Sequence, residues 1–235
     1  MKHKKTTTIS NILITIMLVF LFACTTTYSV NMVANYNNSD VIYNGNKQSN
    51  YVTLMFNVYW GNEYIDGILD CLNKYDIRTT FFVGGAWVEK NREILAKIIS
   101  AGHEIGNHGY FHSDHQKLNY EQNYEEIKAC NDLVNVYFGY KIKLFAPPSG
   151  AFNNATIEAA QALGCATIMW TYDTIDWRDK NSTLIYNRAT KKVSGGSLVL
   201  MHPTEKTLEA LPAILEYYKL NNLQVVTASQ NISIE

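Results

Sequence analysis

Four of the six histidines follow segments that the residue pattern predicts as β-strands. His108, His112 and His115 come after one such segment, and His202 comes directly after another. The spacing His108-x3-His112 can bring two imidazoles to one side of a turn, an arrangement that suits a Zn²⁺-type ion. Histidines that are only hydrogen-bonded within the fold can have the same spacing. The pair therefore predicts a metal site but leaves a structural role open.

Two further segments carry groups that could take part in chemistry. Asp173 and Asp176 follow another expected strand, where a carboxylate can act in a site or cap a turn. Residues 146–150, Ala-Pro-Pro-Ser-Gly, form a stiff loop that could direct backbone N–H groups at a ligand or simply end a strand. Imidazoles, carboxylates and such a loop together favour metal-assisted hydrolysis, without naming the substrate.

The elements that must position these residues alternate along the chain. Short apolar runs predict strands at 52–58, 79–83, 103–105, 143–146, 166–170, 197–201 and 224–227. Helical patterns lie between them at 64–75, 88–101, 120–137, 154–163, 182–193 and 208–220. About seven β/α units predict one α/β domain with a parallel sheet, closed as a barrel. Chemistry in such a barrel gathers at the carboxyl ends of the strands.

Composition limits the class of protein further. The chain has 235 residues, 47% hydrophobic and 17% charged, which fits one domain with a full core and excludes a disordered chain. Its formal net charge is −1, and without the first 24 residues 17 Lys and Arg face 21 Asp and Glu, a net of −4. A nucleic-acid partner held by electrostatic attraction is therefore not expected.

The N-terminus predicts export. Three lysines precede an apolar stretch at 12–23 that is too short for a comfortable membrane span. Residues 21–24, Leu-Phe-Ala-Cys, resemble a bacterial lipobox, so lipidation of Cys24 and a plain or uncleaved signal both stay open. Residues 25–50 are polar and predict a tether to a domain at 51–235. We expect an exported protein of the cell envelope or medium, with membrane contact only through its N-terminal segment.

From about residue 51 to 227 the chain resembles the NodB-homology polysaccharide deacetylases, through five motifs in the family's order. They are TTFFVG at 79–84, GHEIGNH at 102–108 with the H-x3-H pair, the Pro-Pro-x-Gly loop at 147–150, D-x-x-D-W at 173–177 and L-M-H at 200–202. Trp60-Gly61 also resembles the Gram-positive branch related to sporulation deacetylases. The resemblance implies a distorted (β/α)7 barrel that removes acetyl groups from N-acetylated, peptidoglycan-like glycan.

The resemblance also implies roles for single residues. In the family one Asp and two His hold a divalent metal, expected to be Zn²⁺, while a neighbouring Asp is the general base. Carried over, His108 and His112 are metal ligands, His202 is the general acid and Asp176 orients it. The same transfer assigns the oxyanion to the backbone N–H of Ser149, beside Pro148, and the wall of the acetyl pocket to Trp177 and Leu200.

The first motif departs from the family. Where the family has T-F-D-D-G, this chain has Met-Phe-Asn-Val-Tyr-Trp-Gly at 55–61. Asn57 stands at the position of the base, and an amide cannot accept a proton near neutral pH. Val58 stands at the third ligand and has no donor atom. Ala146 replaces the Arg that steadies the base, which fits, because an Arg buried against a neutral Asn would lack a charge partner.

Two hypotheses follow from this mixture. The retained Asp176, His202 and both metal-site histidines slightly favour weak deacetylation. Water, His115 or Asp114 would then supply the missing ligand, and water or Asp173 would act as the base. Loss of both family aspartates favours a pseudoenzyme that binds cell-wall glycan without cleaving it.

Overall fold

The computed structural model describes residues 15, 17 and 41–234 of the chain. Most of the export signal expected at 1–24 and most of the tether expected at 25–50 therefore lie outside the described residues. Among the described residues, no helix has the length and apolar character needed to cross a membrane. The domain begins at Val41 and runs to the C-terminus.

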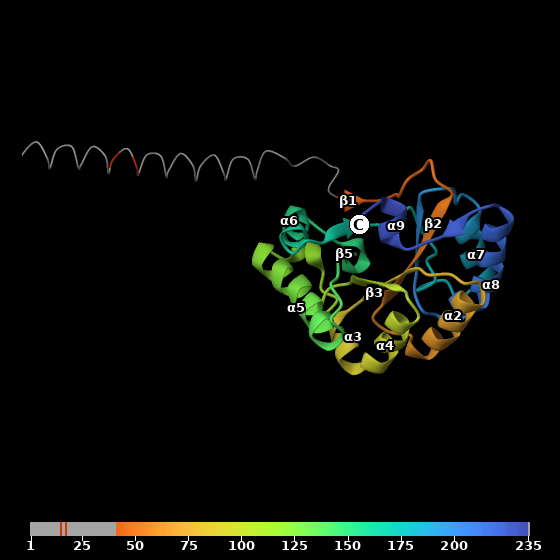
Figure 1. Cartoon of the computed structure of the whole chain (residues 1–235), viewed down its shortest axis with the longest axis horizontal. Coiled ribbons are helices and arrows are strands. Elements are labelled where there is room, and N and C mark those ends of the chain that lie inside the picture. Colours follow the sequence, from red (N-terminus) through yellow and green to blue (C-terminus); the bar gives the residue numbers. More distant parts are fainter. Residues whose placement is uncertain (1–14, 16, 18–40, 235) are drawn as a thin grey trace, which may run out of the picture. The chain divides into compact units, whose positions relative to one another are not determined.

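Strands and helices alternate through this domain (Figure 1). The strands are β1 (Val41–Ile42), β2 (Tyr51–Val58), β3 (Thr80–Val83), β4 (Glu104–Asn107), β5 (Leu144–Phe145), β6 (Ala166–Ile168), β7 (Tyr172–Asp173), β8 (Ser197–Met201) and β9 (Gln224–Val225). The helices are α2 (Asn62–Lys74), α3 (Gly85–Lys90), α4 (Arg92–Ser100), α5 (Tyr120–Phe138), α6 (Asn154–Ala162), α7 (Ser182–Thr190), α8 (Glu205–Leu220) and α9 (Ala228–Ile232). Two 3₁₀ turns, η1 (His115–Lys117) and η2 (Pro148–Gly150), lie in loops.

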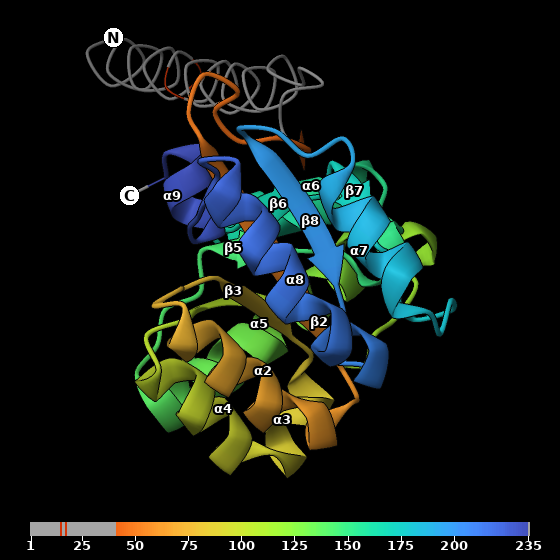
Figure 2. The same cartoon turned by 90° about the vertical axis from the view of Figure 1, so that its right-hand side faces the viewer.

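The strands form one curled sheet in the order β1-β6-β5-β4-β3-β2-β8-β7, with β9 paired to β2. Every pairing is parallel. Helices cover its outer side, as α2 and α8 do in Figure 2. The α/β fold and the distorted (β/α)7 barrel are confirmed. In the described part of the chain no pairing joins β1 to β7, so the sheet stays open at this seam, unlike the closed barrel we expected.

Strand β2 is the centre of the sheet, and all of its residues after Tyr51 are buried. Its side chains alternate between the two faces, as strand geometry requires. Phe56 and Val58 belong to the core between sheet and helices. Met55 belongs to the smaller cluster inside the barrel. Asn57 follows the Met55 side and therefore reaches the interior of the barrel, where the strand ends converge.

Two expectations about the elements need correction. The domain does not start at residue 51, because β1 pairs with Thr167 and Ile168 of β6 and the Gly45 N–H donates to the carbonyl of Gly196. A two-residue strand is too short to show an apolar alternation in the sequence. The single helix expected at 88–101 is divided into α3 and α4 at Asn91, whose φ of −131° leaves the helical region.

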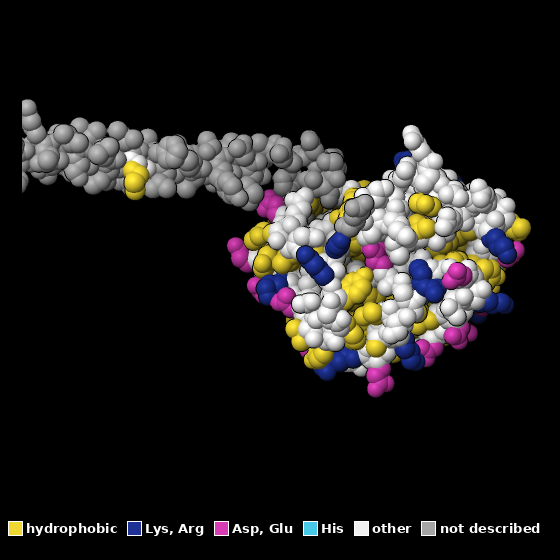
Figure 3. Space-filling view, in the orientation of Figure 1, with side chains coloured by type: hydrophobic (Ala, Val, Ile, Leu, Met, Phe, Trp, Pro, Cys, Tyr) yellow, Lys and Arg dark blue, Asp and Glu magenta, His cyan; other side chains and the backbone are white. Residues whose placement is uncertain are grey.

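Charged side chains on the surface are mixed in sign. Figure 3 shows one face of the domain on which Lys and Arg are interspersed with Asp and Glu. Several oppositely charged neighbours are paired, such as Lys97 with Asp66 at 2.8 Å. This face offers no broad field of one sign to a partner.

Candidate functional site

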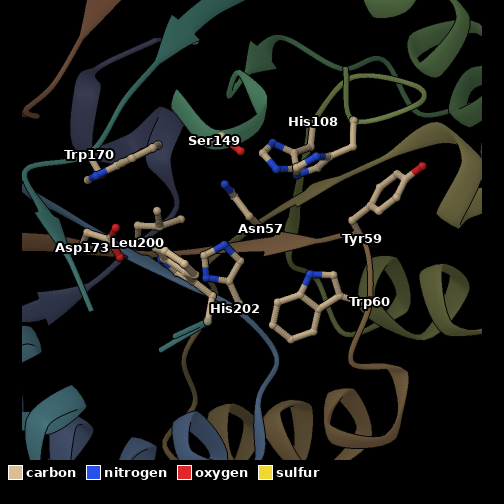
Figure 4. A pocket seen from close by; sticks show the side chains of 11 residues that line it. Asn57, Tyr59, Trp60, His108, Ser149, Trp170, Asp173, Leu200 and His202 are labelled. Carbon is tan, nitrogen blue, oxygen red and sulfur yellow. The ribbon is translucent and has the colours of Figure 1, made fainter. Parts of the chain in front are cut away.

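A cleft of about 590 Å³ opens at the carboxyl ends of the central strands. Its lining residues are Asn57, Tyr59, Trp60, His108, His112, Ser149, Trp170, Asp173, Trp177, Leu200 and His202 (Figure 4). The structure thus brings together seven of the nine residues that the sequence nominates for the site. The other two, Pro148 and Asp176, are buried and do not line the cleft.

His202 is held by a buried carboxylate. Asp176 has a fully buried side chain, and its Oδ1 accepts the Nδ1–H of His202 at 2.8 Å. Its Oδ2 accepts the backbone N–H of His202 at 2.7 Å and the hydroxyl of Thr207 at 2.6 Å. Because a carboxylate only accepts, Nδ1 of His202 carries a proton, and the ring is oriented so that Nε2 is left for the cleft. Asp176 therefore lies where an orienting residue would have to lie.

An indole covers one face of this imidazole. The Trp60 and His202 rings lie parallel, with centroids 5.8 Å apart and planes 5° apart. Trp60 is 45% exposed, so its outer face remains open to a ligand. Trp60 follows the end of β2, where the sequence predicts chemistry, but its stacking on His202 was not predicted.

His108 is almost completely buried, and its ring is fixed by one hydrogen bond. Its Nδ1–H donates to the carbonyl of Ala146 at 2.7 Å, which leaves Nε2 facing the cleft as an acceptor. Burial first, and the neighbouring His112 second, lower the pKa of His108 to about 3, so the ring is neutral at neutral pH. Figure 4 shows His108 and His202 reaching into the same space as Asn57.

His112 is presented by a strained loop. Its φ of 58° lies in the left-handed region, and its ring packs on Tyr59 and on His108 with centroids 5.0 and 5.1 Å away. Glu126 of α5 anchors this loop, because its Oε2 accepts the backbone N–H groups of Tyr110 and Phe111 at 3.0 Å each. Helix α5 thus sets the position of His112.

His115 and Asp114 do not complete a metal site. His115 is fully buried outside the cleft lining, and its Nδ1 pairs with Asn123 Oδ1 at 2.6 Å. Asn123 of α5 thus gives this imidazole an interior partner instead of a metal. Asp114 forms an ion pair with Lys117 at 2.9 Å. Within the ranges that the structure describes, no group of three or more His, Cys, Asp or Glu could hold a metal.

The substituted positions explain this result. Asn57 is 4% exposed, and its Oδ1 is buried without a hydrogen-bond partner among the described residues. Val58 is buried in the core outside the cleft, and Ala146 is buried inside the barrel. The donor set for a divalent ion is two imidazoles, one short of the three protein ligands of a catalytic Zn²⁺ centre. The residues present do not fit the family's metal site.

The loop after β5 has the conformation that brings Ser149 to the cleft. Ser149 has a φ of 55°, and Gly150 follows at 68°. A side chain at Gly150 would lie 2.8 Å from the ring of Trp170, so a small residue is required there. The role of the Ser149 backbone N–H at an oxyanion stays a prediction.

Aromatic side chains form much of the cleft wall, and sequence analysis assigned only Trp177 among them. Tyr59, Trp60 and Trp170 join it. Each of these three lies within two residues of a strand end, which is the signal that could have found them. Asp173 lines the cleft too, but its Oδ1 accepts the N–H of Ile175 at 2.7 Å, as a turn-capping residue does.

The comparisons with known proteins identify the class. The polysaccharide deacetylase family model matches residues 44–168, just over half of the chain, and the chain belongs to this family. Protein YlxY of Bacillus subtilis is 41% identical over 178 residues, which cover 76% of this chain and 56% of YlxY. The peptidoglycan-N-acetylmuramic acid deacetylase PdaA of Bacillus subtilis is 28% identical over 171 residues, 71% of this chain and 65% of PdaA. The chain thus matches less than two thirds of the length of these relatives.

Solved structures share the fold and divide in function. BA3943 of Bacillus anthracis, described as a CE4 family pseudoenzyme, superposes with a TM-score of 0.80 at 35% identity, over 83% of this chain and 69% of that one. A mutant of it is described as having restored enzymatic activity. The Bc1960 peptidoglycan N-acetylglucosamine deacetylase also reaches 0.80, at 26% identity, over 83% of this chain and 94% of that one.

Proposed function

We propose that this chain binds N-acetylated, peptidoglycan-like glycan in the cleft without removing the acetyl groups. The observation that carries the proposal is the pair Asn57 and Val58 at the two positions where the family has aspartates. One offers a neutral amide, and the other is buried in the apolar core. The amide cannot take a proton from water near neutral pH, and the valine has no donor atom for a metal.

The proposed glycan binding depends on the aromatic side chains that line the cleft. Trp177 is 52% exposed and Trp60 is 45% exposed, so broad aromatic faces border the cleft. Apolar walls with a few placed polar groups are usual in sites for small ligands and sugars. PdaA and Bc1960 are named as peptidoglycan deacetylases, and BA3943 is described as a pseudoenzyme of the same fold, so loss of catalysis within this fold has a parallel in the family.

A second function has one specific observation in its favour. The unit of Asp176, Thr207 and His202 keeps an acid-type geometry that a pure binding site does not need. Weak deacetylation would then use His202 as the acid and water or Asp173 as the base. Loss of a base and a ligand each typically lowers the rate about 10²-fold or more, so this activity should be far below that of family enzymes.

The test measures binding, acetate release and metal content on the same purified full chain. We expect an N-acetylglucosamine oligomer to bind, acetate to stay at the level of a His202→Ala variant, and metal to be well below one equivalent. Zn²⁺ should bind only weakly, and less in His108→Ala. Acetate release that is abolished in His202→Ala would replace the proposal with weak deacetylation. Equal metal content in wild type and His108→Ala would show that any metal lies elsewhere.

A further inference from the structure

Asn57 projects from the end of β2 into the floor of the cleft. Figure 4 shows its amide nitrogen directed into the space bounded by Ser149, His108 and His202. The amide oxygen is turned away, buried and without a partner among the described residues. The structure therefore presents an N–H donor from Asn57 to whatever occupies the cleft.

The neighbouring His108 presents the opposite polarity. It donates its Nδ1–H to the carbonyl of Ala146, so its neutral ring turns the Nε2 lone pair towards the cleft. His202 donates its Nδ1–H to Asp176 and directs Nε2 to the same space. Leu200, 3% exposed, adds an apolar side chain to the lining. The floor thus offers a donor, an acceptor and an apolar contact in one place.

An acetamido group has the complementary features. Its carbonyl oxygen accepts, its N–H donates and its methyl group is apolar, whereas the ammonium of a deacetylated sugar only donates. We infer that Asn57 is the residue by which the cleft selects the acetylated sugar, its amide N–H donating to the acetyl carbonyl. This inference rests on the proposed glycan binding and adds that the cleft distinguishes acetylated from deacetylated sugars.

This inference also gives a reason for asparagine where the family has an aspartate. A carboxylate at position 57 would accept only, so it would attract an ammonium and repel the lone pairs of an acetyl oxygen. Asp173 is the acidic residue of the cleft lining in wild type, and its Oδ1 accepts the N–H of Ile175. Asp173 is unchanged in every variant below, so differences among them report on residue 57.

The experiment compares two tetrasaccharides of β-1,4-linked sugars, one of N-acetylglucosamine and one of glucosamine, by titration calorimetry at pH 7 with the full chain. We expect wild type to bind the acetylated oligomer about tenfold more tightly, the usual scale for one mismatched polar contact. Asn57→Asp should lose most of this preference or reverse it. Asn57→Ala should weaken only the acetylated ligand, and it remains informative should the buried carboxylate prevent folding. Asn135→Asp, an exposed site on α5, makes the same charge change and should behave as wild type.

The possible outcomes distinguish failure of the role inferred for Asn57 from failure of the proposed glycan binding. Similar affinities of wild type for both oligomers, unchanged in Asn57→Asp and Asn57→Ala, would overturn the role of Asn57 and leave glycan binding standing. Failure of wild type to bind either oligomer would overturn both. A tenfold loss confined to the acetylated ligand in Asn57→Ala would support the inference, because a merely structural defect would weaken both ligands.

Discussion

An aspartate and an asparagine have almost the same shape, yet only the carboxylate can take a proton from water. On the assignment that we propose, that exchange at position 57 removes a base, and the valine at position 58 removes a ligand. The remaining polar residues are in place, because Asp176 fixes His202 and the carbonyl of Ala146 fixes His108. On the same assignment, the site lacks one half of a mechanism and keeps the geometry of the other.

The first prediction concerns variants that restore the family's base, its metal ligand and the Arg beside them. Asn57→Asp alone should give no acetate release, since the new carboxylate lacks a metal and an Arg. Combined with Val58→Asp and Ala146→Arg, it should increase Zn²⁺ affinity and acetate release from an N-acetylated oligosaccharide, far beyond the sum of the single changes. Val58 and Ala146 are both completely buried, so the triple variant should lose several kcal/mol of stability, about 3–5 in total, and recover part of it with Zn²⁺. A triple variant that folds and binds no Zn²⁺ would contradict the assignment of these positions.

The second prediction concerns Asp176→Asn. The amide cannot accept all three of the bonds that the carboxylate accepts, and one N–H would face the backbone N–H of His202. We expect the free energy of unfolding to fall by about 2–4 kcal/mol in urea titrations. Asp66→Asn removes an exposed ion pair with Lys97 and should cost less than about 1 kcal/mol. Equal losses in the two variants would show that Asp176 is not a structural centre of the site.

At the scale of elements, strand pairing decides which side chains meet. The register Asn57↔Phe82 and Val83↔Asn107 sets β2, β3 and β4 side by side, so their ends lie at one edge. Helix α5 then contributes from outside the sheet, through Glu126 to the His112 loop and through Asn123 to His115. The cleft is consequently a product of several elements, and no single one contains it.

The third prediction uses a buried histidine at the opposite ends of these strands. His103, just before β4, is 4% exposed, and its Nδ1 accepts the backbone N–H of Thr79 at 3.2 Å. Burial first, and the charge of Arg78 second, lower the pKa of His103 from 6.5 to about 4. Below pH 6.5 the unfolded chain takes up a proton that the folded chain refuses until about pH 4. This contribution to stability is present above 6.5 and is lost as the pH falls through that window.

The measurement is the unfolding free energy at a series of pH values between 7 and 4. In wild type the pKa difference should contribute a loss on the order of 1–2 kcal/mol over this window. His103→Asn keeps an acceptor for Thr79 and has no group that titrates there, so its profile should be flatter by that amount. Parallel profiles would mean that His103 is not responsible, leaving other buried histidines such as His115, whose pKa burial also lowers.

At the scale of the whole molecule, a cell-wall ligand requires the cleft to be outside the cytoplasm. The basic start, the apolar segment at 12–23 and the polar run behind it support export of the chain, which we propose on the sequence alone. In a Gram-positive host, fractionation should place the full chain with the envelope or the medium. Finding it in the cytoplasm would contradict export, whereas Cys24→Ser that still attaches to the membrane would contradict only lipidation.

The sequence by itself determined the family, the order of the β/α units and most residues at the strand ends. Apolar runs and helical periods are local properties, and the motif residues stand directly after them, so His108, His202 and Leu200 could be placed in one cleft without coordinates. The substitutions at 57, 58 and 146 were equally readable, because each is a change of chemistry at a recognised position.

Other features depended on contacts between distant segments. The pairing of β1 with β6, the division of α3 from α4 and the open seam of the sheet leave no periodic trace in the sequence. His115 was a candidate ligand until Asn123 of α5 gave it a buried partner, and Trp60 became part of the cleft only by stacking on His202. Such facts are decided by tertiary structure, because hydrogen bonds and ring contacts follow distance in space, and spacing along the chain reports that distance only within one element.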